Sequence, residues 1–144
     1  MIRAVIDTSI LIRALIKPRG TVGPILQALR DADYQLVYSD PLLAELTDVL
    51  TRPRLAKKYG VTTEDVATVL SLILLRGEPV LPVRRIDACR DPMDNMVMEA
   101  AVAGQVDFIV SGGKDLLTLS PFERIPVLSP AAFLRRLASE RRRA

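Results

Sequence analysis

The chain has 144 residues, of which 49% are hydrophobic and 26% are charged, a composition typical of one soluble globular domain with a buried core. It contains no histidine, which excludes Ser-His-Asp and Cys-His catalysis and zinc sites with imidazole ligands. Cys89 is the only cysteine, so an internal disulfide and a thiolate metal cluster are excluded as well. Any chemistry must therefore use carboxylates, hydroxyls, lysines and arginines.

The two ends of the chain differ in character. The first residues include Arg3 and Asp7 and no apolar signal region, and the longest apolar stretch, 69–75, is too short to span a bilayer. We therefore expect a cytoplasmic protein without a membrane segment. At the other end, five arginines and one glutamate give residues 133–144 a net charge of +4, whereas the whole chain carries +3. We expect one domain over 1–132 and a basic tail over 133–144, either solvated or in contact with phosphate or an acidic partner.

Strands and helices alternate along the chain, as judged from apolar periodicity and from Asp, Thr, Pro and Gly at the boundaries. In chain order we expect a strand over 2–6, helices over 9–16 and 23–31, a strand over 35–38, helices over 40–51, 53–59 and 62–77, a strand over 80–83, a helix over 94–103, a strand over 107–111, a helix over 114–119, a strand over 125–128 and a helix over 130–137. Parallel neighbours need crossover connections, which helices provide. The alternation therefore predicts an α/β fold, a three-layer α/β/α sandwich with a mostly parallel sheet.

Acidic residues recur where a parallel sheet brings the carboxyl ends of its strands together, the edge at which such sheets bind ligands. Asp7 directly follows the first strand, and Asp115 follows a later strand and a double-glycine turn. Asp94 starts a helix on the stripe that must face the sheet, and Glu45 borders the apolar stripe of another helix. Each has a structural explanation, as a helix cap or a solvent-facing side chain. As a set they predict one acidic site, near which Asp91 is either a turn residue or a ligand.

Such a set of carboxylates predicts a divalent cation. Two carboxylates about 4 Å apart repel by about 4 kcal/mol at an effective dielectric constant of 20, and a bound cation removes this cost. Ligands that are all oxygen fit Mg²⁺ or Mn²⁺ better than zinc. These ions act on phosphate esters by orienting water and stabilising developing charge, which requires no histidine.

Four segments resemble the PIN-domain ribonucleases, in particular the VapC-like toxin components of toxin-antitoxin pairs. They read VIDTSIL, LLAELTDVL, DPMDNMVMEAAVAG and DFIVSGGKDLL, and they carry Asp7, Glu45, Asp94 and Asp115 in turn. The resemblance covers nearly the whole chain, from residue 2 to about 128. It implies an α/β/α sheet, an acidic site for Mg²⁺ or Mn²⁺, hydrolysis of RNA, homodimerisation and inhibition by a cognate antitoxin.

The same resemblance implies a role for each matching residue. Asp7, Glu45, Asp94 and Asp115 would be catalytic and hold the metal directly or through water, with Asp91 in support. Four polar neighbours would orient these carboxylates or touch the scissile phosphate, although turn and cap chemistry also explains them: Thr8, Ser9, Asn95 and Ser111. The implied reaction is in-line attack of a metal-activated water on phosphorus, which leaves a 5′ phosphate.

One position departs from the family pattern, because Gly113 stands where similar proteins usually have an aspartate. Either Asp115 supplies the fourth carboxylate, or the site is one ligand short and its metal binding and activity are weakened. Two other functions stay open: a PIN-like module that binds RNA or a protein without catalysis, and a phosphatase or phospho-accepting domain. Neither of these two functions accounts for Glu45 as well as the ribonuclease function does. The helix over 66–75 is apolar over more than half of its circumference, which makes it a candidate dimer or antitoxin interface.

Overall fold

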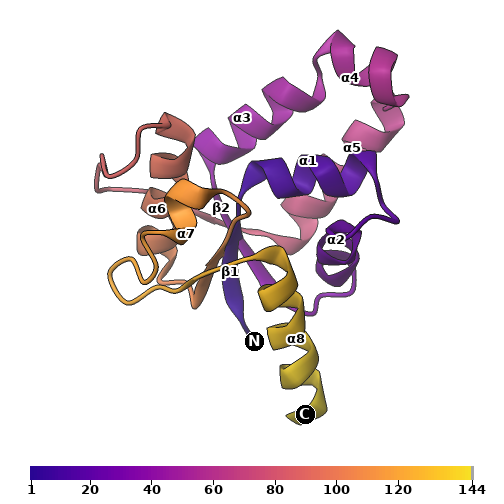
Figure 1. Ribbon diagram of the computed structural model, residues 1–144. Coiled ribbons are helices and arrows are strands. Elements are labelled where there is room, and N and C mark those ends of the chain that lie inside the picture. The colour runs from indigo at the N-terminus through magenta and orange to yellow at the C-terminus, as the bar shows by residue number, and fades with distance from the viewer. Residues whose placement is uncertain (144) are drawn as a thin grey trace.

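The computed structural model describes residues 1–143 and has a five-stranded sheet at its centre (Figure 1). The strands are β1 (Arg3–Ile6), β2 (Gln35–Ser39), β3 (Glu78–Val80), β4 (Phe108–Val110) and β5 (Val127–Leu128). They lie in the order β3-β2-β1-β4-β5, and neighbours are parallel. The chain thus builds outward from β1 in one direction through β2 and β3, and in the other through β4 and β5. The direction of winding reverses between β1 and β4.

Helices cover both faces of this sheet. They are α1 (Thr8–Ile16), α2 (Gly23–Arg30), α3 (Asp40–Leu50), α4 (Pro53–Tyr59), α5 (Thr63–Arg76), α6 (Pro92–Gly104), α7 (Lys114–Leu117) and α8 (Pro130–Arg143). Figure 1 shows α6 and α7 on one side of β1 and β2, with α1, α2, α5 and α8 on the other. This arrangement confirms the predicted three-layer α/β/α sandwich.

The central strand β1 shows why the sheet is covered twice. Successive side chains of a strand point to opposite faces. Val5 packs in the core beneath α6 and α7, whereas Ala4 and Ile6 pack in the core beneath the other helices. An apolar run without polar alternation therefore specifies a strand that is buried on both faces.

Several boundaries differ from those predicted, and two of the differences have a clear structural reason. The third strand covers 78–80 instead of 80–83, because its pairing with β2 ends at Val80, and Leu81 and Val83 are 81% and 90% exposed in the following loop. Helix α6 begins two residues before Asp94, because Asp91 is its N-cap. Helix α3 begins at residue 40 as predicted, and its cap is Ser39, whose hydroxyl accepts a hydrogen bond from the Leu42 N–H at 3.4 Å.

The basic segment over 133–143 continues α8 without a break, and residue 144 of the expected tail lies outside the described residues. Phe133 and Leu137 are buried in the core. The ring of Phe133 packs edge-on against Tyr34, with 5.1 Å between the ring centroids. The helix is thus part of the domain, and its terminal arginines complement the partial negative charge at a helix C-terminus.

Helix α5 has the broad apolar surface expected from its sequence. Val69, Leu72 and Ile73 are buried against the sheet side, whereas Leu74 and Leu75 are 61% and 76% exposed. No helix within residues 1–143 has the length and apolar character needed to cross a membrane.

Candidate functional site

Asp7 lies at the carboxyl edge of the sheet, where the winding reverses between β1 and β4. Its backbone N–H donates to the carbonyl oxygen of Val110 at 2.9 Å. Its Oδ2 accepts a hydrogen bond from the Ser111 hydroxyl at 2.9 Å, and that hydroxyl oxygen accepts one from the Gly113 N–H at 3.0 Å. Its Oδ1 accepts a longer bond from the Ser9 N–H, at 3.3 Å, which caps α1. Ser9, which follows β1, and Ser111, which follows β4, therefore hold the Asp7 carboxylate at the reversal point. Open α/β sheets bind ligands at this point.

Asp94 brings a second carboxylate to this edge from the first turn of α6. Partial burial raises the pKa of its carboxyl from 3.8 to about 6, with further contributions from the negative charges of Asp7, Asp91 and Asp115. Coulombic influence falls with distance, so these three carboxylates lie near Asp94. We call Asp7, Asp91, Asp94 and Asp115 the acidic cluster.

Asp91 and Asp115 join the acidic cluster from two different segments of the chain. Asp91 caps α6, and its Oδ1 accepts a hydrogen bond from the Met93 N–H at 2.9 Å. Asp115 lies in the short helix α7, and its Oδ1 is 3.5 Å from Nη2 of Arg90. The Arg90 side chain is 91% exposed. A long, exposed ion pair contributes little to stability, so this pair does not account for the position of either residue.

Glu45 is half-buried on α3, a helix that packs against both α1 and α6. It is not among the carboxylates that raise the pKa of Asp94. The structure therefore brings together four of the five predicted acids, and it places Glu45 on a neighbouring helix of the same region.

The four predicted polar neighbours have different surroundings. The Ser111 hydroxyl donates a hydrogen bond to the Asp7 carboxylate. Thr8 is buried and lines a small apolar cavity beneath α1 and α3, while Ser9 uses its backbone N–H to cap α1. Within the described residues, the hydrogen bonds of the Asn95 side chain go to loop backbone and not to a carboxylate.

Two residues of this region were not predicted from the sequence. Cys89 lies beside the acidic cluster, where burial and then the charges of Asp94, Asp115 and Asp91 raise the pKa of its thiol. A thiol that stays protonated is a poor metal ligand. Arg90, in the loop before α6, lies 3.5 Å from Asp115 of α7. Its position directly before Asp91 was the signal in the sequence that could have identified it.

Gly113 is exposed and has a backbone φ of −82°, which any residue adopts. A Cβ atom added there would meet only the Ser111 Oγ within 4 Å, at 3.4 Å. The fold therefore leaves room for an aspartate at this position, and the missing carboxylate is a property of this sequence.

Comparisons with known proteins identify the family of this chain. A family model described as "PIN domain" matches residues 3–115. The chain belongs to the PIN-domain family. PIN domains are typically nucleases and generally use a divalent metal ion.

Similar proteins cover most of this PIN domain. The uncharacterized protein MJ1680 of Methanocaldococcus jannaschii is 30% identical over 118 residues, which are 82% of this chain and 75% of that protein. The crystal structure of PAE2754 from Pyrobaculum aerophilum has a TM-score of 0.60 and 16% identity, over 96% of this chain and 90% of that one. VapBC2 from Rickettsia felis, solved bound to a DNA fragment from their promoter, has a TM-score of 0.49 and 18% identity, over 89% and 97% of the two chains. The likeness to PAE2754 concerns the fold.

The residues of this PIN domain fit a divalent ion by their chemistry. The acidic cluster offers carboxylate oxygens, and in the described part of the chain Arg90 is the cation paired with it. As the side chains stand, no three Asp, Glu or Cys groups within residues 1–143 are close enough to hold an ion, so side-chain rotation would accompany binding. The raised pKa of Asp94 reflects an electrostatic cost that a cation would relieve.

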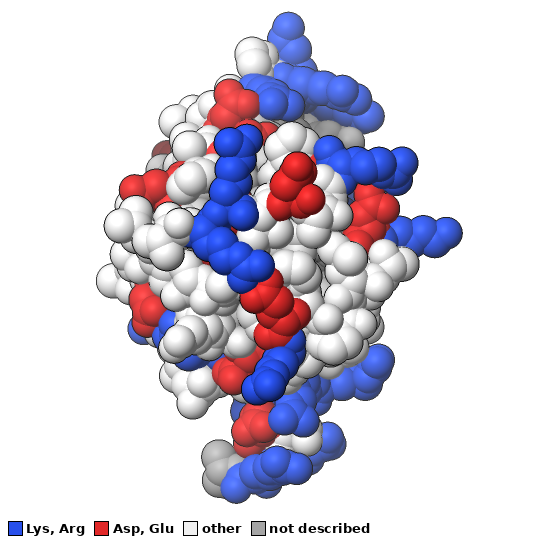
Figure 2. Space-filling model, turned by 90° about the vertical axis from the view of Figure 1, so that its left-hand side faces the viewer, with Lys and Arg blue, Asp and Glu red and all other residues white. Residues whose placement is uncertain are grey.

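The face that carries α6 and α7 has an uneven distribution of charge. Figure 2 shows basic side chains at the top and the bottom of this face and in a run near its centre, with acidic side chains between them. The lower group lies at the end of the molecule where α8 finishes (Figure 1). The PIN domain therefore presents both signs of charge on this face, and the acidic cluster does not stand in a uniformly negative surface.

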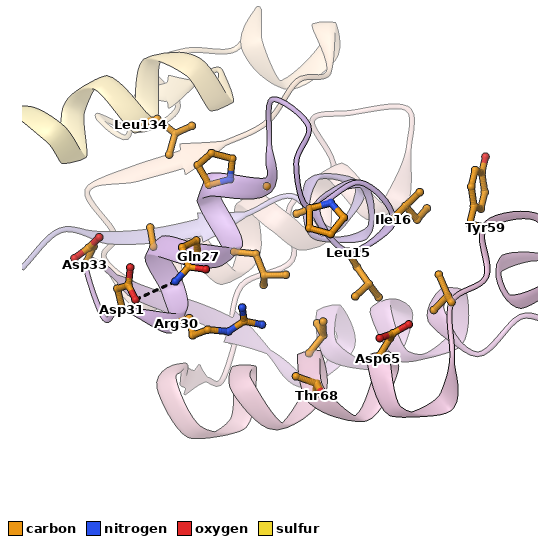
Figure 3. Close-up of a pocket in the computed structure, with 18 of the residues that line it drawn as sticks. Leu15, Ile16, Gln27, Arg30, Asp31, Asp33, Tyr59, Asp65, Thr68 and Leu134 are labelled. Carbon is orange, nitrogen blue, oxygen red and sulfur yellow. Dashed lines mark hydrogen bonds between the residues drawn. The ribbon is translucent and has the colours of Figure 1, made fainter.

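A separate cavity of about 750 Å³ lies on the other side of the sheet, among α1, α2, α5 and α8. Figure 3 shows Arg30 extending from α2 towards α5, and the Gln27 amide donating to Asp31 at 3.1 Å. Among the described residues that line it, none belongs to the acidic cluster. This cavity is therefore not part of the candidate catalytic site.

Proposed function

We propose that this PIN domain is a metal-dependent endoribonuclease that hydrolyses RNA phosphodiester bonds with Mg²⁺ or Mn²⁺ at the acidic cluster. The observation that carries the proposal is the position of Asp7, which the Ser111 hydroxyl and the Val110 carbonyl hold at the carboxyl edge of the sheet, with the carboxylates of other segments near it. Helix capping explains Asp7 and Asp91 individually. Helix capping does not explain why Asp94 lies where ionisation of its carboxyl is disfavoured. Residues with strongly shifted pKa values concentrate at functional sites.

Each residue has a distinct role in this proposal. Asp7 and Asp94 would hold the ion, Asp115 and Glu45 would complete the set directly or through water, and Asp91 would support it. Ser111 donates to one oxygen of Asp7 and so fixes the direction of the other. When bound, a divalent ion supplies charge neutralisation and activation of water for hydrolysis at phosphorus.

Cleavage of labelled single-stranded RNA tests this function. We expect cutting by the wild type with Mg²⁺ or Mn²⁺, none with EDTA, and none by Asp94→Asn. Asp31→Asn is the matched control, because Asp31 is the C-cap of α2 and its side chain accepts a hydrogen bond that asparagine can also accept. Cutting that persists in EDTA, or that survives Asp94→Asn, would rule the proposal out.

A second function is a PIN-like module that binds RNA or protein without cutting, and Gly113 favours it because it removes a carboxylate from the site. If the wild type does not cut RNA but Gly113→Asp does, the protein has this second function and its catalytic site is disabled. Cleavage by the wild type would show instead that Asp115 suffices.

We further propose that this PIN domain is the toxin of a toxin-antitoxin pair, on the basis of the four resembling segments. Expression of the wild type is then expected to arrest growth, whereas Asp94→Asn is tolerated at the same protein level. An antitoxin would relieve the arrest when expressed with the wild type. Equal growth with both proteins would contradict the toxin assignment.

Helix α5 supports the proposal of a homodimer. Its exposed Leu74 and Leu75 offer apolar surface to a second copy. Light scattering is expected to give the mass of a dimer for the wild type and of a monomer for Leu75→Glu. A monomeric wild type at high concentration would exclude this interface.

A further inference from the structure

The loop over 81–91 crosses from β3 to α6 and is held in place by α6 itself. The Glu99 carboxylate accepts a hydrogen bond from the Ile86 N–H at 2.8 Å, and Ile86 is buried in the core. Asn95 Oδ1 accepts bonds from the N–H groups of Ala88, at 3.1 Å, and Cys89, at 2.8 Å, and Asn95 Nδ2 donates to the Cys89 carbonyl at 3.0 Å. Two side chains of one helix therefore fix the backbone up to the residue before Arg90.

The side chain that this loop presents is almost entirely in solvent. Arg90 is 91% exposed, and its contact is the 3.5 Å approach to Asp115. Arg84 on the same loop is engaged differently, since its guanidinium donates to Glu123 at 2.6 Å. The loop thus places a weakly paired guanidinium directly at the acidic cluster.

We propose that Arg90 binds a phosphate of the RNA strand beside the acidic cluster, and that Asn95 and Glu99 position the loop for this contact. The inference rests on the proposed function, because it names how the same site would take its substrate. A cluster of carboxylates repels a polyanion, so a cation at its rim is needed to hold the strand.

The chemistry of arginine fits this role. Its planar guanidinium donates two parallel hydrogen bonds to phosphate oxygens and stays charged at all relevant pH values. Arg90 would give up little stability by leaving Asp115 for a phosphate, since a long, exposed ion pair contributes little. The exchange would also leave Asp115 available to the metal.

RNA binding tests the role of Arg90 directly. The full chain with Asp94→Asn, which is expected not to cut, is titrated into a fluorescent single-stranded RNA with Mg²⁺ at several salt concentrations. Adding Arg90→Gln is expected to raise Kd about tenfold, the loss of one charged hydrogen-bonded contact. It is also expected to reduce the slope of log Kd against log salt by about 0.7. Arg54→Gln, an exposed arginine on α4, is the control and is expected to change neither value.

A second measurement addresses the positioning of the loop. In cleavage assays with an otherwise wild-type chain, Arg90→Gln is expected to raise KM for RNA more than it lowers kcat. Asn95→Ala is also expected to raise KM, although Arg90 itself is unchanged in this variant. A merely structural Asn95 would change thermal stability without changing KM.

The outcomes separate this inference from the proposed function. Unchanged Kd and salt slope in Arg90→Gln, with cleavage by the wild type intact, would overturn the role of Arg90 alone. Faster cleavage or tighter Mg²⁺ binding by Arg90→Gln would also overturn it, and would show that Arg90 competes with the metal for Asp115. A wild type that neither binds nor cuts RNA would overturn the proposed function itself.

Discussion

Replacing Asp94 by asparagine is expected to stabilise the metal-free protein while abolishing its activity. The pKa of Asp94 rises from 3.8 to about 6, first because the carboxyl is partly buried and then because three other carboxylates lie near it. At about 1.4 kcal/mol per pKa unit, the shift corresponds to an upper limit of about 3 kcal/mol. Solvent screening of a side chain that is only partly buried reduces this value to about 1 kcal/mol.

The sign of this effect depends on pH. Because the pKa is higher in the folded state, the folded protein binds this proton more tightly than the unfolded chain does. The penalty is therefore absent below the unfolded pKa, grows as the pH rises from about 4 to about 6, and is fully present at neutral pH. Asparagine mimics the protonated carboxyl and removes the penalty.

Thermal unfolding in EDTA at low salt measures the effect. Asp94→Asn is expected to raise Tm by about 4 °C at pH 7.5 and by much less at pH 4. Asp31→Asn, outside the acidic cluster, is expected to leave Tm unchanged. Adding Mg²⁺ should raise the Tm of the wild type more than that of Asp94→Asn, because the ion binds the folded wild type. A variant that is less stable at pH 7.5, or equally stabilised at both pH values, would refute the reasoning.

Three further predictions concern the same region. Gly113→Asp is expected to tighten Mn²⁺ binding about tenfold by calorimetry, because a side chain there meets only Ser111 Oγ, at 3.4 Å, and adds a carboxylate; an unchanged affinity would count against the position being at the site. Asn95→Ala should lower the free energy of unfolding by about 2 kcal/mol and speed amide exchange at 88–89, and unaltered exchange would show that Asn95 does not hold the loop. Cleavage should fall below about pH 6 as Asp94 becomes protonated and should recover with more Mg²⁺, whereas a flat profile from pH 5 to 7.5 would contradict the assignment.

Much of the fold could be predicted because local patterns and long-range packing agree. The apolar run of β1 specified a strand buried on both faces, and Asp7 at its end marked the start of α1. Once the sheet is parallel, residues that follow different strands meet at one edge. Asp7 and Asp115 could therefore be assigned to one region although about a hundred residues separate them in the sequence.

What could not be predicted depends on contacts that have no sequence period. Leu81 and Val83 continue an apolar run, but the pairing of β3 with β2 ends before them and leaves both exposed. Asn95 was assigned to the carboxylates from its position in the chain, whereas its amide binds the backbone of a loop without regular structure. Arg90 depends on the same loop, since only the loop conformation brings it to Asp115.

Crystals grown with Mn²⁺ test the central claim most directly, since the anomalous signal locates the ion without assumptions about substrate. We predict one Mn²⁺ at the carboxyl edge of the sheet, bound by oxygens of Asp7 and Asp94 at about 2.1 Å, and no ion there in crystals of Asp94→Asn. If the acidic cluster holds no Mn²⁺ in crystals grown at a Mn²⁺ concentration that supports RNA cleavage in solution, the account is contradicted.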